Sequence, residues 1–203
     1  MITMKQYSDA CEQNKDPILA VLREAFKNVR NVLEIGSGTG QHAVYFSAQL
    51  PYLQWQTSDL PENHPGINAW LREAGLANTL TPIALDTRNA SWPQNTPGKS
   101  YDGLFSANTT HIMDWPAVQG LFAGAGALLE NNGRFCLYGP FNYQGTYSSD
   151  SNRRFDTSLK ARDPASGIRH FEELDSLANQ NNMVLETDHE MPVNNRLLVW
   201  KKC

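Results

Sequence analysis

The segment that most constrains the fold runs from Val32 to His42 and reads Val-Leu-Glu-Ile-Gly-Ser-Gly-Thr-Gly-Gln-His. A short apolar run ends at Ile35, three glycines follow at alternate positions, and a helix-compatible segment begins at Gln41. Strand, glycine turn and helix in this order hold nucleotide-like ligands, because glycine lets a ligand approach the main chain near a helix N-terminus. The segment therefore predicts a ligand-binding crevice at the end of a first strand.

The spacing of the glycines narrows the class of ligand. The dinucleotide fingerprint G-x-G-x-x-G requires its third glycine one position later, where this chain has Gln41. An acidic residue, Glu34, instead stands two positions before G-x-G-x-G. This pattern resembles motif I of the class I S-adenosylmethionine (SAM) methyltransferases. The resemblance implies that Glu34 holds the loop or reaches the methionine amino group, and that SAM contacts come from Gly36, Ser37, Gly38, Gly40 and His42.

Alternating strand and helix patterns continue beyond the loop. Short apolar runs predict strands at residues 31–35, 53–57, 81–85, 101–106 and 134–139. Apolar residues at helical spacing predict helices that begin at Asp16-Pro17, Gln41, His64-Pro65, Trp115-Pro116 and His170. Two final strands, 183–190 and 196–201, have no helix between them and must be antiparallel. We expect one α/β domain over residues 1–203, with a Rossmann-like, doubly wound, seven-stranded sheet that is mostly parallel and has an antiparallel C-terminal strand.

Two glycines interrupt the predicted helix that starts at Trp115. Gly120 and Gly124 each cost about 1 kcal/mol relative to alanine in a helix interior. Their presence predicts a close approach between this helix and the sheet, and a turn at Asn131-Asn132-Gly133 is expected to follow the helix.

Two less regular segments are expected near the ligand. Residues 140–169 are rich in Ser, Asn, Asp and Arg and lack strand periodicity, which predicts a lid or specificity wall on the substrate side over 142–169. The segment Tyr7–Asn14 is expected to precede the first helix and to fold over the ligand, with Asn14 as a hydrogen-bonding residue.

Acidic residues follow the second and third predicted strands. In an open parallel sheet, ligands bind outside the carboxyl ends of the strands. Asp59 can accept hydrogen bonds from ribose hydroxyls, and Asp86 can accept one from an exocyclic adenine amine. Each aspartate alone also fits a turn or a helix cap. Their coincidence with Glu34 favours a single SAM site, and Leu60, Thr87 and Asn108 are further candidate cofactor contacts.

The overall composition disfavours several kinds of partner. The 203 residues carry a formal net charge of −4, which argues against general affinity for nucleic acid or an anionic membrane. The first sixteen residues are polar where a signal peptide would be apolar, and nothing approaches the roughly 20 apolar residues of a membrane span. Three widely separated cysteines suit neither a disulfide framework nor a zinc site, and no metal is expected. A cytoplasmic location follows as the simplest expectation.

Local sequences elsewhere in the chain resemble a narrower family. It is the methyltransferase-like 26 family, which has been catalogued mainly as a domain of unknown function. The resemblance implies SAM as the cofactor and names no substrate. This chain departs from the expected pattern at Thr109-Thr110, where a bulkier apolar residue is expected. The matching sequences are Asn14–Leu19, Val32–His42, Asn108 with His111-Ile112, Gly139–Phe141, Phe155-Asp156 with Ser158-Leu159, Gly167–Arg169, and Met191-Pro192 with Asn194-Asn195.

Candidate residues for catalysis and acceptor binding lie after the fourth and fifth strands. His111 is the best-placed titratable residue, because an unperturbed histidine pKa near 6.5 suits general-base work. A surface or capping histidine before Pro116 is equally consistent with the sequence. Tyr143 is a second catalytic candidate, and with Asn142 it could orient the acceptor. Arg154 is available for an anionic substrate, although surface pairing with aspartates is the simpler interpretation.

Three functions remain open at the level of sequence. The first is a SAM-dependent methyltransferase that acts on an unidentified, small-molecule acceptor. The second is a SAM-binding interaction module without methyl transfer activity. The third, an NAD-dependent oxidoreductase, is disfavoured by Gln41. The oligomeric state is left open.

Overall fold

The computed structural model describes residues 5–89, 92 and 100–203. The strands of its central sheet are β1 (Asn31–Ile35), β2 (Gln54–Asp59), β3 (Thr79–Ala84), β4 (Tyr101–Ala107), β5 (Leu129–Gly139), β8 (Met183–Met191) and β9 (Asn195–Lys202). They form a seven-stranded sheet in the order β3-β2-β1-β4-β5-β9-β8. β1 to β5 pair in parallel, and β9 is antiparallel to both of its neighbours. The predicted doubly wound, mostly parallel fold is confirmed.

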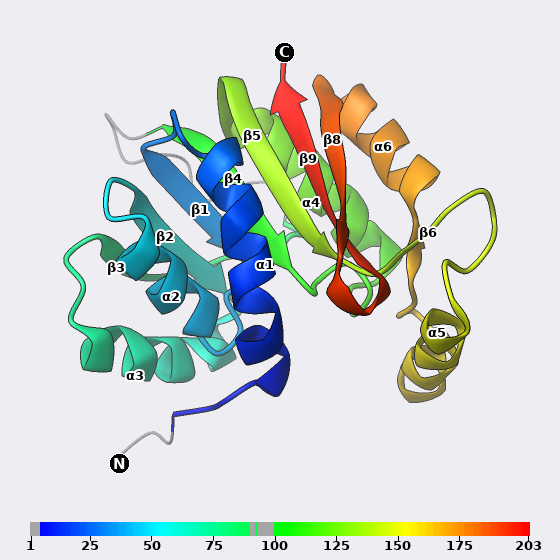
Figure 1. Cartoon of the computed structure of the whole chain (residues 1–203), viewed down its shortest axis with the longest axis horizontal. Helices are drawn as coiled ribbons and strands as arrows, with labels where there is room; N and C mark the ends of the chain where they lie inside the picture. Colours follow the sequence, from blue (N-terminus) through cyan, green and yellow to red (C-terminus); the bar gives the residue numbers. More distant parts are fainter. Residues whose placement is uncertain (1–4, 90–91, 93–99) are drawn as a thin grey trace.

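Helices cover both faces of this sheet (Figure 1). They are α1 (Asp9–Ala25), α2 (Gln41–Gln49), α3 (His64–Ala74), α4 (Trp115–Leu128), α5 (Asp150–Arg162) and α6 (Phe171–Gln180). α1, α2 and α3 lie on one face, α4 and α6 lie on the other, and α5 lies beyond the end of the strands. In the part of the chain that the structure describes, no helix has the length and apolar character needed to cross a bilayer.

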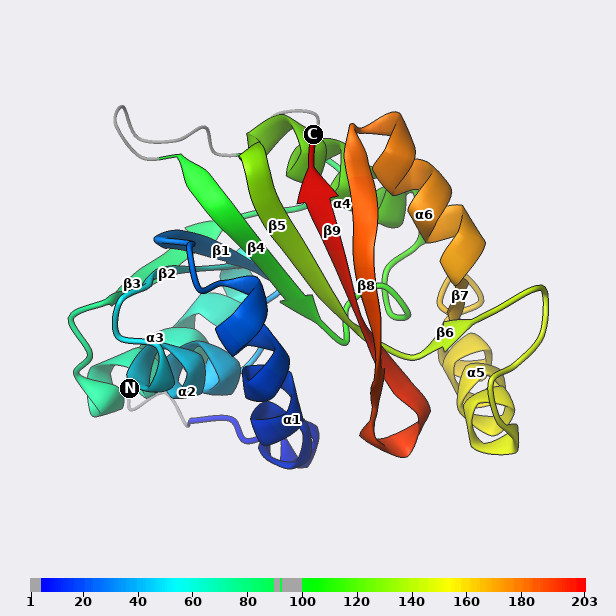
Figure 2. The ribbon, with the colours of Figure 1, turned by 45° about the horizontal axis from the view of Figure 1, so that its top comes forward.

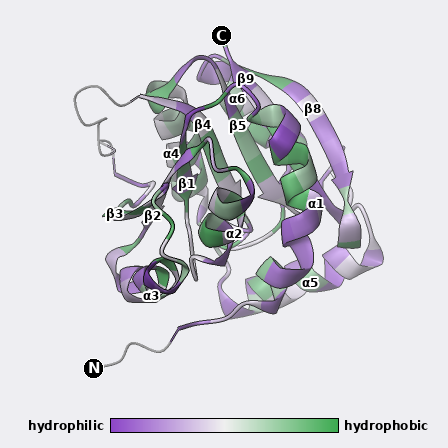
Figure 3. Cartoon of the chain, turned by 60° about the vertical axis from the view of Figure 1, so that its left-hand side comes forward, coloured by the Kyte–Doolittle hydropathy of each residue, from purple (hydrophilic) through white to green (hydrophobic). Residues whose placement is uncertain are grey.

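Each face of the sheet buries its own apolar cluster. On the side of α1 and α2, the rings of Phe46, Trp55 and Phe105 pack with centroids 5.4–5.8 Å apart. On the side of α4 and α6, Phe135 stacks on Trp200 at 5.9 Å. Figure 3 shows the contrast with the edge strand β8, which is hydrophilic along much of its length. Charged side chains on an edge strand disfavour pairing with another chain.

The first helix begins earlier than the Asp16-Pro17 signal predicts. Ser8 caps α1 by accepting a hydrogen bond from the backbone NH of Cys11 at 3.3 Å. Pro17 therefore lies inside the helix, where it removes one intrahelical hydrogen bond. The expectation that Tyr7–Asn14 precedes the first helix is wrong, because most of this segment is the first part of α1.

The polar segment after β5 contains a helix that its hydropathy does not predict. The short strands β6 (Phe141–Asn142) and β7 (Arg169–His170) pair in parallel, and α5 lies between them. The buried positions of α5 are Asn152, Asp156 and Leu159. Two of these three side chains are polar, so a search for an apolar stripe misses the helix.

Some strand limits also differ from the prediction. β2 extends to Asp59, so this residue ends the strand rather than following it. β5 begins at Leu129 and includes the predicted turn at Asn131-Asn132-Gly133. Within that stretch the pairing of β5 with β4 changes register, and Asn132 adopts a positive φ of 67°. The order and direction of the strands are unaffected.

Segments far apart in the sequence meet at the carboxyl edge of the sheet. Figures 1 and 2 both place the start of α1, helix α5 and the turn between β8 and β9 at the edge toward which β4 and β5 point. A parallel sheet binds its ligands at this edge. The fold therefore surrounds the predicted crevice with elements from both ends of the chain.

The two glycines of α4 lie at close contacts, but not with the sheet as predicted. A Cβ atom at Gly120 would overlap the backbone carbonyl of Thr87, and one at Gly124 would overlap the ring of Trp92. The close neighbours are therefore residues that follow β3, not the strands themselves. α4 depends on glycine at these positions for its distance from that segment.

Alanine at Gly120 should destabilise the protein, although helix propensity alone would favour it by up to about 1 kcal/mol. The added Cβ would meet rigid backbone at Thr87, so α4 must shift. Gly66→Ala in α3 is the matched control, because its nearest neighbour is the Gln6 side chain at 3.8 Å. We expect chemical denaturation to show a loss of stability for Gly120→Ala only. Equal stability of the two variants would contradict this account.

Candidate functional site

The glycine loop is fixed against the end of β2. The backbone NH groups of Gly36 and Ser37 both donate to the carbonyl of Ser58, at 3.1 and 2.9 Å. Gly36, Gly38 and Gly40 have φ values of 74°, 57° and 91°. These values lie in the left-handed region, which side chains with a Cβ rarely adopt. The loop therefore needs glycine at alternate positions to turn sharply from β1 into α2.

The three glycines have different surroundings. A Cβ atom on Gly36 would lie 2.7 Å from Cγ2 of Thr109, and one on Gly40 would lie 3.1 Å from the Cα of Ile67. A Cβ atom on Gly38 would meet nothing within 4 Å. Gly36 and Gly40 thus allow close packing, whereas Gly38 leaves open space beside the main chain.

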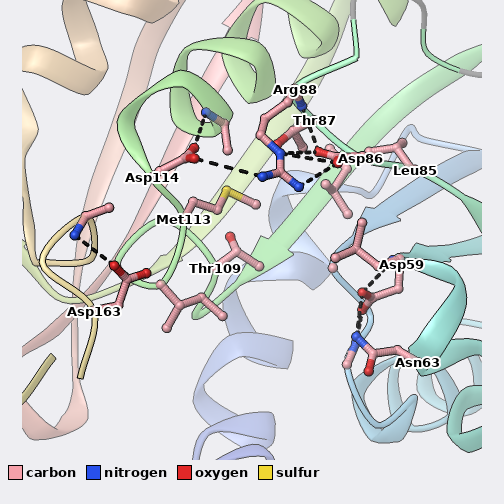
Figure 4. A pocket seen from close by; sticks show the side chains of 17 residues that line it. Asp59, Asn63, Leu85, Asp86, Thr87, Arg88, Thr109, Met113, Asp114 and Asp163 are labelled. Atoms are coloured by element: carbon pink, nitrogen blue, oxygen red, sulfur yellow. Dashed lines mark hydrogen bonds and ion pairs between the residues drawn. The ribbon is translucent and has the colours of Figure 1, made fainter.

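A cavity of about 600 Å³ lies beside this loop and is here called the first cavity (Figure 4). Its volume is typical of a small-molecule site. The structure brings together in its wall six of the residues that the sequence predicts for an adenosine site. They are Gly36, Gly38, Asp59, Leu60, Asp86 and Thr87.

Asp59 joins the glycine loop to the end of β2. One carboxylate oxygen accepts the backbone NH of Gly38 at 2.7 Å. The other accepts the NH of Leu60 at 2.7 Å and the side-chain amide of Asn63 at 2.8 Å. A carboxylate offers about four acceptor positions, so these three bonds leave one position unused. Asn63, which the sequence analysis missed, helps to orient this carboxylate.

Arg88 is a second residue that the sequence analysis missed. Its guanidinium bonds to Asp86 through Nε at 3.0 Å and Nη2 at 2.7 Å, and it lies 4.0 Å from Asp114 (Figure 4). Hydrogen bonds from the side chain and backbone of Arg88 hold the pKa of Asp86 below its usual range. The carboxylate that we expected to meet an adenine amine is therefore already occupied by a half-exposed guanidinium. A planar guanidinium can also stack on an aromatic base.

Apolar side chains from the loop after β4 complete the first cavity. Ile112 and Met113 line it, and Figure 4 shows Met113 extending over its centre. The sequence signal for them was their position between His111 and the α4 cap Asp114, which accepts the NH of Ala117 at 2.8 Å. Figure 4 shows Asp59 and Asp86 on one side of the cavity and Asp114 and Asp163 on the other, with Met113 between them.

Glu34 lies beneath the glycine loop and lines neither cavity described here. It is 2% exposed, and its carboxylate accepts the indole NH of Trp55 at 3.1 Å. Burial raises its pKa to about 7, against the opposing effects of hydrogen bonds from Trp55 and Ser37, with a further increase from Asp59. This placement supports the first predicted role of Glu34, holding the loop.

A second cavity, of about 470 Å³, lies between α1, α5 and the turn between β8 and β9. Three predicted site residues line it: Asn14 from α1, and Asn108 and His111 from the loop after β4. Asn108 has a positive φ of 59°, and its NH donates to the Tyr138 carbonyl at 2.9 Å. The loop after β4 therefore separates the two cavities, with Thr109 and Ile112 facing the first and Asn108 and His111 facing the second.

His42 connects α2 to α1 below the second cavity. Its Nε2 lies 2.7 Å from Oδ1 of Asn14, and its ring stacks on Phe46 at 5.2 Å. Burial lowers the pKa of His42 to about 4, so the ring is neutral at physiological pH. This contact fixes Asn14, which is itself buried in α1.

His111 is a buried, neutral imidazole at the wall of the second cavity. Burial lowers its pKa to about 4, with smaller effects from Arg169 and Arg162. Its ring meets Phe155 of α5 edge to face, with centroids 5.4 Å apart. Among the described residues, Nδ1 of His111 has no hydrogen-bond partner. The interpretation of His111 as a surface histidine is therefore wrong, since the side chain is 6% exposed.

The loop that carries His111 is held by its carbonyl groups. Each carbonyl of residues 110–113 accepts a hydrogen bond from the segment 166–169. The donors are the Ser166 hydroxyl, the Gly167 NH and the guanidinium of Arg169. Arg169 is thus used in positioning the loop and not in a surface ion pair.

Asp156 joins α5 to the same segment. Its carboxylate accepts the NH of Ile168, the hydroxyl of Tyr147 and the ammonium of Lys160, each at 2.7 Å. The side chain is buried, and a buried carboxylate requires such partners. The loop of His111, β7 and α5 therefore form one hydrogen-bonded unit.

Three other predicted residues lie away from both cavities. Asn142 is buried in β6, and its Oδ1 has no partner among the described residues. Tyr143 lines a third cavity near the turn between β8 and β9, where its hydroxyl donates to Asp188 at 2.9 Å. Burial, followed by this carboxylate, raises the pKa of Tyr143. Arg154 is exposed on α5 and lines none of these cavities.

The described residues also contain no group of three or more His, Cys, Asp or Glu placed to hold a metal ion. The three cysteines, Cys11, Cys136 and Cys203, are free thiols. The arrangement therefore offers hydrogen-bonding groups, carboxylates and an imidazole for binding and proton transfer.

The family model described as protein of unknown function (DUF938) matches residues 5–202. The chain belongs to this family. Because the match covers nearly the whole sequence, the glycine loop, α5 and the final hairpin all lie within the DUF938 unit.

Solved structures similar to the DUF938 chain include O-methyltransferases. An O-methyltransferase family 2 protein from Planctomyces limnophilus, in complex with apigenin, matches with a TM-score of 0.82 and 16% identity over 96% of this chain and 58% of its own. An O-methyltransferase family protein from Burkholderia thailandensis matches with a TM-score of 0.81 and 15% identity over 96% of this chain and 57% of its own. PigF with SAH matches with a TM-score of 0.78 and 14% identity over 94% of this chain and 56% of its own. This chain spans little more than half the length of these proteins, and the likeness shows the fold.

The buried carboxyl group of Glu34 predicts a pH-dependent stability for the DUF938 chain. The pKa of Glu34 in the folded chain, about 7, exceeds the ordinary value of 4.5. The stability that the protonated carboxyl group contributes is therefore fully present below about pH 4.5 and is lost as the pH rises through 7. Glu34→Gln removes this loss. Between pH 4 and pH 8, the stability of the variant relative to wild type should increase by on the order of 3 kcal/mol.

Denaturant unfolding at the two pH values measures this difference. Glu130→Gln serves as the control, because Glu130 is exposed and should show no such pH dependence. A relative stability of Glu34→Gln that stays constant across the pH range would show that the carboxyl group ionises normally.

Proposed function

We propose that this protein is a SAM-dependent methyltransferase that acts on a small-molecule acceptor. One observation carries the proposal: the glycine loop, Asp59 and Asp86 line a single cavity at the carboxyl edge of the sheet. That combination is expected for an adenosine-containing ligand. The fold shared with the O-methyltransferases and with PigF, whose structure is that of the protein with SAH, supports the proposal. The narrower resemblance to the methyltransferase-like 26 family is part of this proposal.

The residues of the first cavity fit the adenosine half of SAM. Gly38 exposes bare backbone to the cavity, Asp59 has an open acceptor position, and Met113 offers an apolar surface for a base. Asn14 and Asn108 border the second cavity, on the other side of the loop after β4. Bound SAM supplies an activated methyl group on a sulfonium, so the protein has chiefly to bind, align and exclude water.

His111 is the residue that would accept a hydrogen bond from the acceptor's protic group. Its imidazole is neutral above about pH 5, because its pKa is lowered to about 4, and its unpartnered Nδ1 is available to accept a hydrogen bond. Residues 166–169 fix the loop beneath it. The role proposed for the chain is therefore to hold a protic acceptor group against His111 and away from water. The same proposal includes residues 142–169 as the wall on the substrate side. It also includes a cytoplasmic location.

A binding module without transfer activity is the second candidate. It is favoured by the position of Tyr143, whose hydroxyl donates to Asp188 and lies beside a different cavity. Of the two predicted acid–base residues, only His111 borders the second cavity. A module of this kind would bind SAM and leave its methyl group in place.

Calorimetry with SAM tests the cofactor site. Gly38→Asn should weaken binding at least about tenfold, or 1.4 kcal/mol, because its side chain would fill the open space beside the loop, and asparagine tolerates a positive φ. Asp59→Asn should have a similar effect through its lost acceptor. Glu62→Gln is the control, since Glu62 is exposed on the neighbouring turn and lines neither cavity.

Equal affinity of all variants for SAM, or no binding by wild type, would refute the cofactor assignment. Methyl transfer is tested separately, by following labelled methyl groups from SAM into a small-molecule extract. Labelled product that is lost in His111→Gln supports the methyltransferase. Tight SAM binding without any product supports the module.

A further inference from the structure

The second cavity has a wall without charged side chains. Its lining comes from α1, the loops after β4 and β5, α5 and the turn Pro192–Asn194. Among the described residues that form this wall, none is Lys, Arg, Asp or Glu, and His111 is neutral because burial lowers its pKa. The first cavity contrasts sharply, since Asp59, Asp86 and Arg88 all line it. A charged molecule in the second cavity would lose its hydration without gaining a partner of opposite charge.

Two apolar side chains stand at the outer side of this cavity. Phe155 of α5 packs edge to face on His111 and is still 38% exposed. Val193 is 76% exposed, although it lines the same cavity. Flat or aliphatic groups that entered the cavity beside these side chains would cover both of them.

The backbone at Val193 is strained. Its φ and ψ are 61° and 37°, in the left-handed region that a β-branched residue strongly disfavours. Strain of this kind persists only where the surroundings enforce it, and it concentrates at ligand sites. Two hydrogen bonds hold the backbone next to Val193. The side-chain amide of Asn152 donates to the Asn194 carbonyl, and the side-chain amide of Asn194 donates to the Ser151 hydroxyl, both at 3.1 Å.

His111, against which Phe155 packs, carries a buried polar atom. Nδ1 of His111 has no partner among the described residues, and it lies 3.9 Å from the position of a Cβ on Gly139. A buried nitrogen without a hydrogen bond is costly. A hydroxyl or other protic group on a bound molecule would satisfy it.

We propose that the second cavity binds an uncharged, ring-bearing molecule with a protic group, and that Phe155 and Val193 are its specificity-determining residues. The ring lies under Phe155 and Val193, and the protic group meets Nδ1 of His111. This inference rests on the proposed methyl transfer only in naming that molecule as the acceptor. It excludes the anionic substrate considered for Arg154, whose side chain is exposed outside the cavity.

Paired probes of one shape test the charge preference. 2-Naphthol is uncharged at neutral pH and carries a hydroxyl, whereas 2-naphthoate is an anion of nearly the same size. Fluorescence titration of the wild-type chain, with and without S-adenosylhomocysteine, should show at least tenfold tighter binding of 2-naphthol. Equal binding, or a preference for 2-naphthoate, would overturn the inference.

Two variants test the roles of Phe155 and Val193. Phe155→Ala should weaken 2-naphthol binding five- to tenfold. Val193→Asn should weaken it three- to fivefold and at the same time raise the melting temperature, because asparagine tolerates the left-handed backbone. Val184→Asn is the control for affinity, since Val184 is an exposed valine of β8 that lines none of the cavities described here. An unchanged affinity for 2-naphthol in both Phe155→Ala and Val193→Asn would refute the roles of these two residues.

The two proposals can fail separately. If SAM binds and 2-naphthol does not, the cavity inference is wrong and the cofactor site stands. If 2-naphthol binds with the predicted dependence on Phe155 and Val193 and SAM does not bind, the cavity inference stands and methyl transfer is refuted.

Discussion

The hydrogen bonds between the glycine loop and the end of β2 are the constraint on which the site depends. The Ser58 carbonyl accepts two backbone NH groups of the loop, and the carboxylate of Asp59 accepts the NH of Gly38. These bonds set the direction of the chain as it leaves β1 and enters α2. Asp59 is thereby both part of the scaffold and part of the wall of the first cavity. Glu34 lines neither cavity and lies buried against Trp55.

The sequence predicted the sheet well because buried parallel strands are short apolar runs, and β1 was placed correctly at both ends. It failed where local signals compete with tertiary structure. Pro17 is typical of a helix start, yet α1 continues back to the cap at Ser8 because residues on both sides of the proline are buried. α5 escaped notice because Asn152 and Asp156 occupy its buried face, held by hydrogen bonds rather than by apolar contact.

The candidate site divides in the same way. The residues of the first cavity could be predicted because the carboxyl ends of parallel strands meet at one edge, so Gly38, Asp59 and Asp86 had to lie near one another. Arg88 could not be predicted, since its partner is Asp86, a carboxylate that we expected to bind a ligand. Phe155 and Val193 could not either, because they line the cavity beside His111 from elements whose positions follow from the tertiary structure alone.

The two cavities differ in a way that suits a transfer reaction. The first offers carboxylates and backbone to a polar nucleoside, whereas the second offers uncharged side chains to a less polar partner. The loop after β4 separates them, with Asn108 and His111 on one side and Thr109, Ile112 and Met113 on the other. That loop must be rigid for the arrangement to work, because a small displacement would move His111 relative to both cavities. The carbonyl contacts from residues 166–169 provide this rigidity, and Asp156 extends it to α5. The polar segment after β5 therefore acts on the site through its hydrogen bonds to the loop of His111 as well as through the wall it builds.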